Sequence, residues 1–197
     1  MRHPLIRSVL AGTAALSLAA CGVNSIPTAE EEVNAQWANV QAEYQRRSDL
    51  IPNLVETVKG YADQEREVLT EVTNARARAT QVQINAEDLD DPAKVRAFNE
   101  AQSQVGSSLG RLLATFEAYP DLKSNQNFLT LQSQIEGTEN SILVARRDYN
   151  QAVQGYNTRI RTFPDMIGAK VIYGSQPKVP FEAAAGADAA PKVDFAS

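Results

Sequence analysis

Apolar side chains recur every three or four residues through most of the chain, which is the spacing that aligns them on one face of an α-helix. The first helix is predicted to begin at Thr28, which forms a capping-box pattern with Glu31. Its apolar positions are Val33, Trp37, Val40, Tyr44, Ile51, Leu54, Val55 and Val58. Pro52 interrupts this run, and an internal proline costs about 3 kcal/mol unless the helix bends or restarts. We therefore expect a kink or break at residues 48–52, with Asp49 placed to cap a restart.

Three further helical stretches follow. A second run of small and β-branched apolar residues covers residues 69–82, and the pair Asp91-Pro92 predicts the start of a third helix, as an N-cap followed by proline at the first position. This third helix keeps an alternation of three and four, as in a coiled coil, with one polar intrusion at Gln102. The longest run is expected to begin after Pro120, with Asp121 at its start, and to extend over residues 122–163 until Pro164 ends it. Trp37, Tyr149 and Tyr156 have helical spacing, which favours core packing over an aromatic ligand box.

The period is lost beyond Gly168, and the Ala-, Gly- and Pro-rich residues 174–197 predict an extended or disordered tail. Apolar residues still recur in this tail and directly before it, namely Tyr173, Val179, Phe181, Val193 and Phe195. A tail that only has to be solvated does not need these side chains, so we expect them to dock on the helices or on a partner. The predicted fold is all-α, an antiparallel up-and-down bundle of three to four long helices with an extended C-terminal tail.

The first twenty residues have the composition of a secretory signal. Arg2 and Arg7 precede an apolar stretch that is shorter than the ~20 residues needed to span a bilayer. The sequence Leu18-Ala19-Ala20-Cys21-Gly22 resembles the lipobox of bacterial lipoproteins, in which the cysteine receives a lipid before cleavage. Cys21 is therefore the predicted lipid attachment site, and a plain secreted protein with a free thiol is the alternative. We expect a membrane-anchored lipoprotein of the cell envelope on the periplasmic face, and Gly22 resembles an outer-membrane sorting signal for a host with two membranes.

These boundaries divide the chain into a signal peptide (1–20), a lipidated cysteine and tether (21–28), a helical bundle (29–166) and a tail (167–197). Cleavage would remove His3, the only histidine, and lipidation would use the only cysteine. Ser-His-Asp triads, Cys-His pairs and zinc ligand sets with His or Cys are thereby excluded. Loss of the two N-terminal arginines takes the formal charge from −5 to −7, which disfavours a nucleic-acid partner.

Two chemical motifs favour structural interpretations. Gly106-Ser107-Ser108-Leu109-Gly110 matches the G-x-S-x-G pattern of hydrolases, but it lies inside a helical run and has no histidine to serve it. The acidic run 87–91 suits a solvated loop ending in a helix cap better than a calcium loop, because the glycine and distal glutamate of such a loop are missing. We assign no catalytic residue, cofactor or metal.

The segment 46–61, RRSDLIPNLVETVKGY, resembles the most recognisable stretch of the LemA family. Further matches lie at 118–123, 127–128, 138–140, 145–150, 157 and 163–164. The resemblance implies an antiparallel helical bundle held at a membrane, in a family without an established enzymatic activity or agreed catalytic residues. Many members use an N-terminal transmembrane helix, so a lipid anchor would set this chain apart from them.

Polar residues near Pro52 and along the last helix are the candidate functional set. They are Arg46, Arg47, Asp49, Asn53, Glu56, Lys59, Arg146 and Arg147, accompanied by Glu139, Asn140, Asn150 and Asn157. An interhelical network that fixes register is favoured over a ligand surface. The leading functional hypothesis is a noncatalytic scaffold or adaptor for envelope proteins, not an enzyme, with homo-oligomerisation left open. The alternative is a carrier that binds a lipid or small apolar ligand between its helices.

Overall fold

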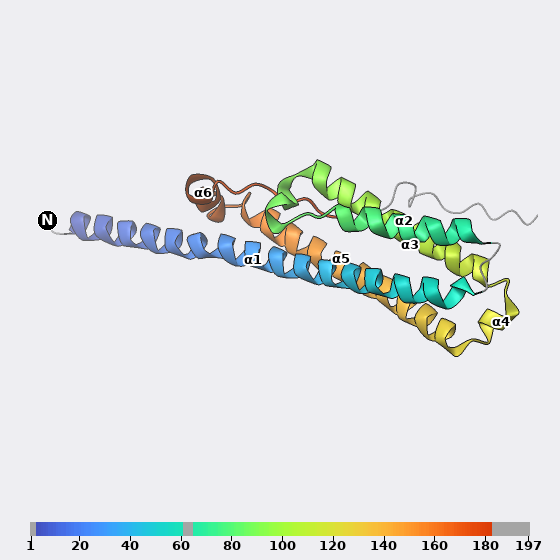
Figure 1. Cartoon of the computed structure of the whole chain (residues 1–197). Helices are drawn as coiled ribbons and strands as arrows, with labels where there is room; N and C mark the ends of the chain where they lie inside the picture. The colour runs from blue at the N-terminus through green and yellow to red at the C-terminus, as the bar shows by residue number, and fades with distance from the viewer. Residues whose placement is uncertain (1–2, 61–64, 183–197) are drawn as a thin grey trace, which may run out of the picture.

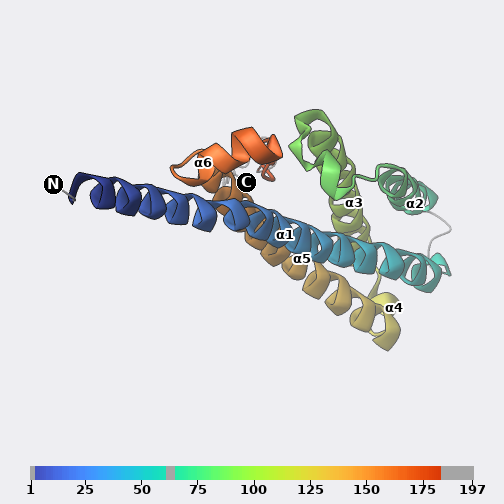
Figure 2. The same ribbon diagram turned by 90° about the vertical axis from the view of Figure 1, so that its left-hand side faces the viewer.

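The computed structural model describes residues 3–60 and 65–182, with side chains from residue 24 onward, and this part of the chain is helical without strands. The elements are α1 (His3–Lys59), α2 (Arg66–Gln81), the 3-10 helix η1 (Ala86–Asp90), α3 (Pro92–Phe116), α4 (Pro120–Lys123), α5 (Gln126–Arg159), α6 (Asp165–Gly168) and the π-helical turn η2 (Ala169–Tyr173). The four long helices run alternately up and down, with α1 paired to α5 and α2 paired to α3 (Figures 1 and 2). The predicted all-α bundle is confirmed.

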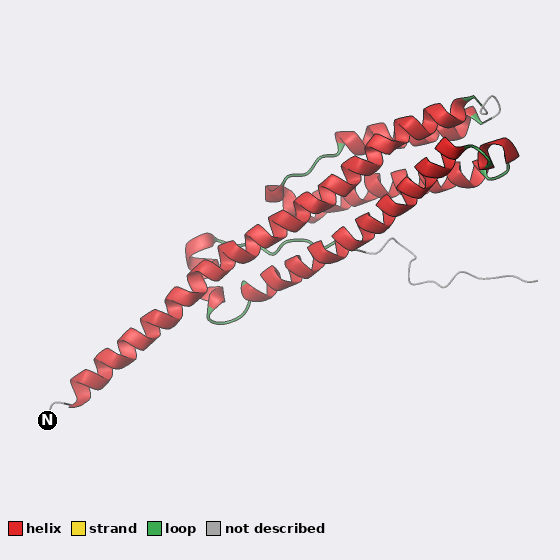
Figure 3. Cartoon of the chain, turned by 90° about the horizontal axis from the view of Figure 1, so that it is seen from below, coloured by secondary structure: helices red, strands yellow, loops and turns green. Residues whose placement is uncertain are grey.

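Helix α1 is longer than the sequence pattern indicates. It runs without interruption for 57 residues, so residues 22–28, expected as an irregular tether, are helical. The Thr28 hydroxyl donates to the carbonyl of Asn24 at 2.8 Å, inside the helix, and therefore does not cap a helix start. The N-terminal part of α1 extends beyond the other helices (Figure 3).

The expected break at residues 48–52 is wrong, because Pro52 lies inside a continuous α1. Proline has no N–H, so the carbonyl four residues earlier, that of Ser48, loses its donor within the helix. The side chain of Arg76 on α2 supplies a replacement, since its Nε donates to the Ser48 oxygen at 2.8 Å. Asp49 is not a cap either, and its carboxylate accepts from Gln45 one turn earlier at 2.7 Å.

The ends of the other long helices follow their capping residues. The carboxylate of Asp91 accepts from the amides of Ala93 and Lys94, with Pro92 in the first turn, as the sequence predicts for α3. Asp121 does not begin the longest helix, because it lies in the short helix α4. The cap of α5 is Asn125, whose side-chain oxygen accepts from the amides of the second and third residues that follow it.

The tail is partly helical and partly docked. The tail predicted as extended or disordered from residue 167 keeps helical turns to Tyr173, and Gly174 then adopts a left-handed φ of 59°, which glycine adopts without steric cost. Residues 175–182 continue as an extended segment along the bundle, where Phe181 is buried. Val193 and Phe195 lie outside the described residues.

The buried side chains form two apolar clusters, one toward each end of the bundle. The first contains Trp37, Tyr44, Phe98, Ile142, Tyr149, Tyr156 and Phe181 among others, and the second contains Ile51, Leu54, Val72, Val105, Leu112, Phe116 and Ile135 among others. Helices α1, α3 and α5 contribute to both clusters. On each of them, the last buried apolar residue of one cluster and the first of the other are seven positions apart, with one inward-facing position between them. The residues at that position are polar, and they form the candidate site.

We predict that Arg76→Met lowers the free energy of unfolding by about 1–2 kcal/mol, because a carbonyl loses a hydrogen bond from a charged donor. In a Pro52→Ala background the same substitution should cost less than about 0.5 kcal/mol, since the new alanine would supply the missing backbone N–H. Urea unfolding of the four variants, followed by circular dichroism, measures this coupling. Arg78→Met is the matched control, because Arg78 donates within its own helix. Equal costs in both backgrounds would refute the role given to Arg76.

Candidate functional site

Arg47 is a buried arginine at the centre of the bundle, with a side chain only 3% exposed. One terminal nitrogen donates to Glu139 Oε1 on α5 at 3.0 Å. The other donates to the carbonyl and the side-chain oxygen of Gln102 on α3, at 2.9 and 2.7 Å. The guanidinium carbon lies 5.0 Å from the ring centre of Tyr44, one turn earlier on α1. We call Arg47, Gln102 and Glu139 the polar layer.

The polar layer occupies the helical seam itself. Arg47 stands between Tyr44 and Ile51 in the three-and-four spacing of α1, and Gln102 stands between Phe98 and Val105 on α3. On α5 the corresponding position is the buried Thr138, whose hydroxyl donates to the Gln134 carbonyl at 2.8 Å, and Glu139 is its neighbour. Three helices therefore place polar groups at one level, which accounts for the division of the core into two clusters.

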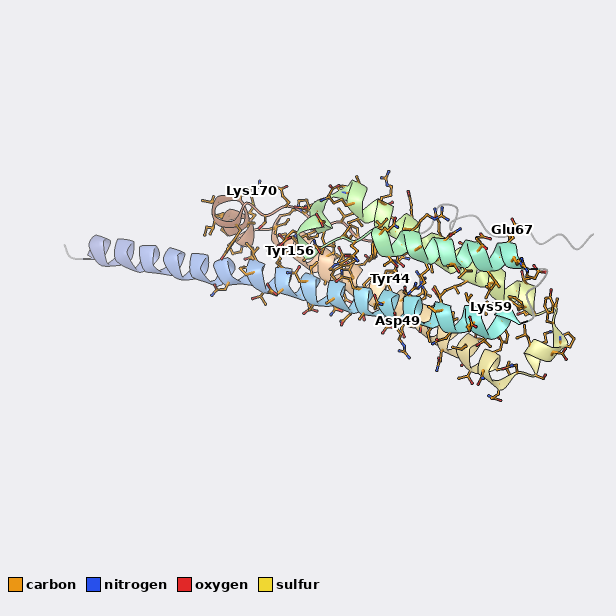
Figure 4. All side chains as sticks on the ribbon, in the orientation of Figure 1. Tyr44, Asp49, Lys59, Glu67, Tyr156 and Lys170 are labelled. Carbon is orange, nitrogen blue, oxygen red and sulfur yellow. The ribbon has the colours of Figure 1, made fainter. Side chains whose placement is uncertain are left out.

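The other predicted polar residues of α1 do not join this layer. Arg46, Asp49, Asn53, Glu56 and Lys59 are exposed along the outer face of the helix. Figure 4 labels Asp49 and Lys59 on α1, together with Tyr44. Lys59 forms an exposed ion pair with Glu56 at 3.4 Å, a kind of contact that contributes little to stability. Grouping these residues with Arg47 as one set is therefore not supported by their geometry.

Arg146 and Arg147 also separate from each other. Arg147 forms an exposed ion pair with its neighbour Asp148 at 2.9 Å. Arg146 instead reaches the tail: it donates to the carbonyl of Glu182 at 3.0 Å, and its guanidinium lies 4.8 Å from the ring centre of Phe181. The asparagines of α5 serve the same purpose, because Asn150 and Asn157 each form two hydrogen bonds with the backbone of residues 178–181.

In the sequence, Gln102 stands out as a polar intrusion and Arg47 as a candidate residue, without a predicted contact between the two. A signal for the connection is present: Tyr44 and Ile51, two apolar positions of the α1 seam, are seven positions apart, and Arg47 occupies the seam position between them. A polar residue at a seam position on each of two helices is the pattern by which coiled coils fix their register.

A pocket of ≈ 280 Å³ lies beside the polar layer, between α1, α3 and the end of α2 with the loop that follows it. Tyr44, Ile51 and Phe98 form apolar parts of its wall, and Gln41, Arg47, Arg76 and Gln83 contribute polar groups. Gln41 also donates to the carbonyl of Ile84 at 3.2 Å, which ties the loop to α1. The pocket is thus bordered by side chains that are already engaged in holding helices together.

The remaining candidate chemistry is structural. Ser108 lies buried inside α3, and its hydroxyl donates to the Val105 carbonyl at 3.0 Å, so the G-x-S-x-G match is not a nucleophile elbow. The acidic run forms η1, where Asp88 accepts from the Asn85 amide and pairs with Lys94. Among the described residues, no group of three or more His, Cys, Asp or Glu is placed to hold a metal ion.

The structure does not test the lipid anchor. The side chain of Cys21 is outside the described side chains, so its modification stays a prediction. Within the described part of the chain, no helix combines the length and the apolar character needed to cross a membrane.

Comparison with known proteins identifies the family. A sequence model described as the LemA family matches residues 36–195. "Protein LemA" of Metamycoplasma hominis is 29% identical over 140 residues, which cover 71% of this chain and 60% of that protein. "Magnetosome protein MamQ 2" of Paramagnetospirillum magneticum is 26% identical over 176 residues, which cover 81% of this chain and 65% of that protein. The chain therefore spans less than two thirds of the length of these relatives.

We predict that Arg47→Ala lowers the free energy of unfolding by about 2–4 kcal/mol, because it leaves a void and removes the donor of Gln102 and Glu139. Arg46→Ala, on the exposed face one residue away, is the matched control and should change stability by less than about 0.5 kcal/mol. Arg47→Lys should recover little, since an ammonium does not reproduce the planar fork of a guanidinium. Urea unfolding monitored by circular dichroism measures all three, and equal effects of the two alanine variants would contradict the polar layer.

The buried tyrosines predict a loss of stability in alkali. Burial raises the pKa of Tyr149 and of Tyr44 above the usual value of 10.0. In the unfolded chain these phenols ionise near pH 10, while the folded chain keeps their protons. The free energy of unfolding should therefore fall as pH rises above 10. Tyr149→Phe should make this decline shallower in urea unfolding between pH 8 and 11, and parallel pH profiles of the two proteins would show that Tyr149 does not contribute.

Proposed function

This chain belongs to the LemA family, and we propose that it is a noncatalytic scaffold or adaptor held at a membrane of the cell envelope. The lipid on Cys21 would be one attachment, and an exposed apolar surface at the same end of the bundle would be a second. The single observation that carries the membrane part of the proposal is this surface. It is formed by α6, η2 and the turn that precedes them.

The apolar surface consists of large side chains that face solvent within a short stretch of chain. Phe163 is 77% exposed, Val171 is 79% exposed, and Ile167, Ile172 and Tyr173 complete the set. Large apolar side chains that are exposed close together in the fold are typical of sites that contact a membrane or a partner. We name these five residues the apolar end surface.

Its position favours a membrane. The Ser25 hydroxyl on α1 donates to the carboxylate of Asp165 on α6 at 2.7 Å, which fastens α6 to a residue four positions along the chain from Cys21. Figures 1 and 2 show α6 beside the part of α1 that leaves the bundle. Exposed Arg161 and Lys170 flank the surface, and Figure 4 labels Lys170 there. Basic side chains next to apolar ones suit the anionic headgroups of a lipid surface.

The scaffold role rests on the chemistry that the bundle does and does not offer. The polar layer, the caps and the buried Ser108 are all engaged in structure, and none of the relatives' names is that of an enzyme. Three relatives are named magnetosome proteins, and these names support an envelope-associated role for this chain.

The pocket beside the polar layer gives little support to the carrier hypothesis. The pocket beside the polar layer has a volume of ≈ 280 Å³, just below the range of about 300–1,000 Å³ that is usual for small-molecule sites. Its wall includes two arginines and several glutamines, which do not match an apolar ligand. We therefore do not favour this pocket as a lipid site.

We predict that the two attachments act together. In cells fed a fatty-acid analogue, the wild-type chain should be labelled and Cys21→Ala should not. Membrane fractionation should show little release for Val171→Asp alone, partial release for Cys21→Ala and nearly complete release for the double variant, because the apolar end surface is the remaining attachment once the durable lipid anchor is absent. Leu143→Asp, an exposed apolar position 64% exposed on α5, is the matched control. Retention of the double variant at the wild-type level would refute the anchoring.

The scaffold part needs a separate readout. Crosslinking in intact cells followed by purification of the wild-type chain should recover specific envelope proteins, which the released double variant should lose. If the released variant recovers the same envelope proteins, the result would argue against a role at the membrane. If neither the wild-type chain nor the variant recovers a specific envelope protein, the result would argue against an adaptor.

A further inference from the structure

The extended segment 177–182 lies in a groove that recognises its backbone. Asn157 donates to the Lys178 carbonyl at 2.8 Å and accepts from the Lys178 amide at 2.9 Å. Two helical turns earlier, Asn150 forms the same pair of bonds with Phe181, at 3.0 and 2.8 Å. Between them, the Tyr149 hydroxyl donates to the Val179 carbonyl at 3.0 Å, and the Val179 amide donates to the Leu89 carbonyl at 2.8 Å. These contacts form what we call the tail groove.

Two side chains of the bound segment are also recognised. Phe181 is 6% exposed, and its ring lies 5.2 Å from that of Tyr149 and 6.0 Å from that of Trp37 on α1. Lys178 is 8% exposed and pairs with Glu30 on α1 at 3.3 Å. The two prolines, Pro177 and Pro180, are exposed. The groove therefore binds the side chains of a lysine and a phenylalanine three positions apart on an extended backbone. The side chain of the residue before the phenylalanine, Pro180, faces solvent.

The same pattern occurs again fourteen residues later. Residues 177–181 read Pro-Lys-Val-Pro-Phe, and residues 191–195 read Pro-Lys-Val-Asp-Phe. The two segments differ at one position, where the first has Pro180 and the second has Asp194. Pro180 is the exposed residue whose side chain faces solvent. Residues 182–190, which connect them, are mostly alanine and glycine. The match to the family extends through residue 195 and therefore includes both segments.

We propose that residues 191–195 of the same chain are a second ligand of the tail groove and exchange with residues 177–181. The hydrogen bonds from Tyr149, Asn150 and Asn157 use main-chain atoms of residues 178–181, and the second segment has the same main-chain atoms. Lys192 would take the place of Lys178 beside Glu30, and Phe195 the place of Phe181 against Trp37. Asp194 would stand at the solvent-facing position.

The first segment has an advantage in this competition. Pro177 lies three positions after Gly174, whereas Pro191 lies seventeen positions after it. The entropy of closing the longer loop favours the first segment by roughly tenfold. A substitution that weakens binding of the first segment should therefore let the second segment occupy the groove. The exchange would release residues 175–190 as a loop, so occupancy of the groove decides which part of the tail is available to a partner.

Trp37 makes the exchange measurable, because it is the only tryptophan in the chain and lies in the groove. In the full chain, Phe181→Ala should keep Trp37 emission and acrylamide quenching near the wild-type values, since Phe195 replaces the lost ring. Phe195→Ala should also resemble wild type. The double variant should shift the emission to the red and raise the quenching constant severalfold. Phe163→Ala, an exposed phenylalanine outside the groove, is the control for the loss of a ring.

Several outcomes would overturn the proposal. If Phe181→Ala alone is quenched as strongly as the double variant, the second segment does not enter the groove. If Phe181→Ala behaves as a dimer in sedimentation while Trp37 stays shielded, the segment comes from another copy and not from the same chain. Adding Lys192→Glu to Phe181→Ala should expose Trp37, because the introduced carboxylate would face Glu30, and continued shielding would contradict the assigned register.

A peptide experiment covers the case in which a variant is damaged. A synthetic peptide of residues 187–197 added to the double variant should restore the shielding of Trp37, and the same peptide with alanine in place of Phe195 should not. The proposal would be overturned if the two peptides had equal effects on the shielding of Trp37, or if neither peptide had an effect. Far-UV circular dichroism of each variant establishes that the bundle is intact.

Discussion

The rest of the structure depends on the burial of one guanidinium. Arg47 joins α1 to α3 and α5 through three hydrogen bonds, and its acceptors come from residues 55 and 92 positions away. Removing an arginine from water is costly, so the gain lies less in stability than in register. A shift of α1 by one turn would put an apolar residue against Gln102 and leave Arg47 among apolar side chains. The polar layer therefore fixes how the three helices are aligned, and the two apolar clusters on either side follow from that alignment.

The alignment of the helices at the polar layer determines which residues come into contact at both ends of the bundle. Toward the α4 end, Arg76 of α2 reaches the Ser48 carbonyl, which Pro52 has left without a donor. Toward the other end, Trp37 and Tyr149 face each other across α1 and α5 with ring centres 5.7 Å apart, and the tail closes over them. A slip between α1 and α5 would disrupt this aromatic contact and separate Glu30 from Lys178. The site that holds the tail is thus a consequence of the layer in the middle of the bundle.

The helical period and the caps predicted the bundle, its order of helices and the start of α3 at Asp91. The errors concern where a helix begins, breaks or ends, because the local pattern does not reveal the tertiary hydrogen bonds that decide these points. Pro52 was expected to break the helix because nothing in the pattern indicates that Arg76 replaces the lost hydrogen bond. Thr28 was expected to cap a helix because the preceding residues lack apolar periodicity, although they extend the helix. In the candidate set, Arg47 is buried in the structure and Arg46 is exposed. In the sequence, only the three-and-four spacing of the seam distinguishes these two arginines.

The two proposed surfaces are mechanically linked through a short piece of chain. The apolar end surface finishes at Tyr173, and the segment in the tail groove begins at Pro177, so only residues 174–176 lie between them. Gly174 turns the chain there, and the Ser175 amide donates to the Ala169 carbonyl at 2.9 Å, which fastens the turn to η2. A surface that binds lipid through α6 and η2 would therefore constrain where the bound segment starts, and release of that segment would loosen η2. Because Asp165 is hydrogen-bonded to Ser25 of α1, that loosening would occur next to the proposed anchor, where a membrane-bound scaffold would meet its partners.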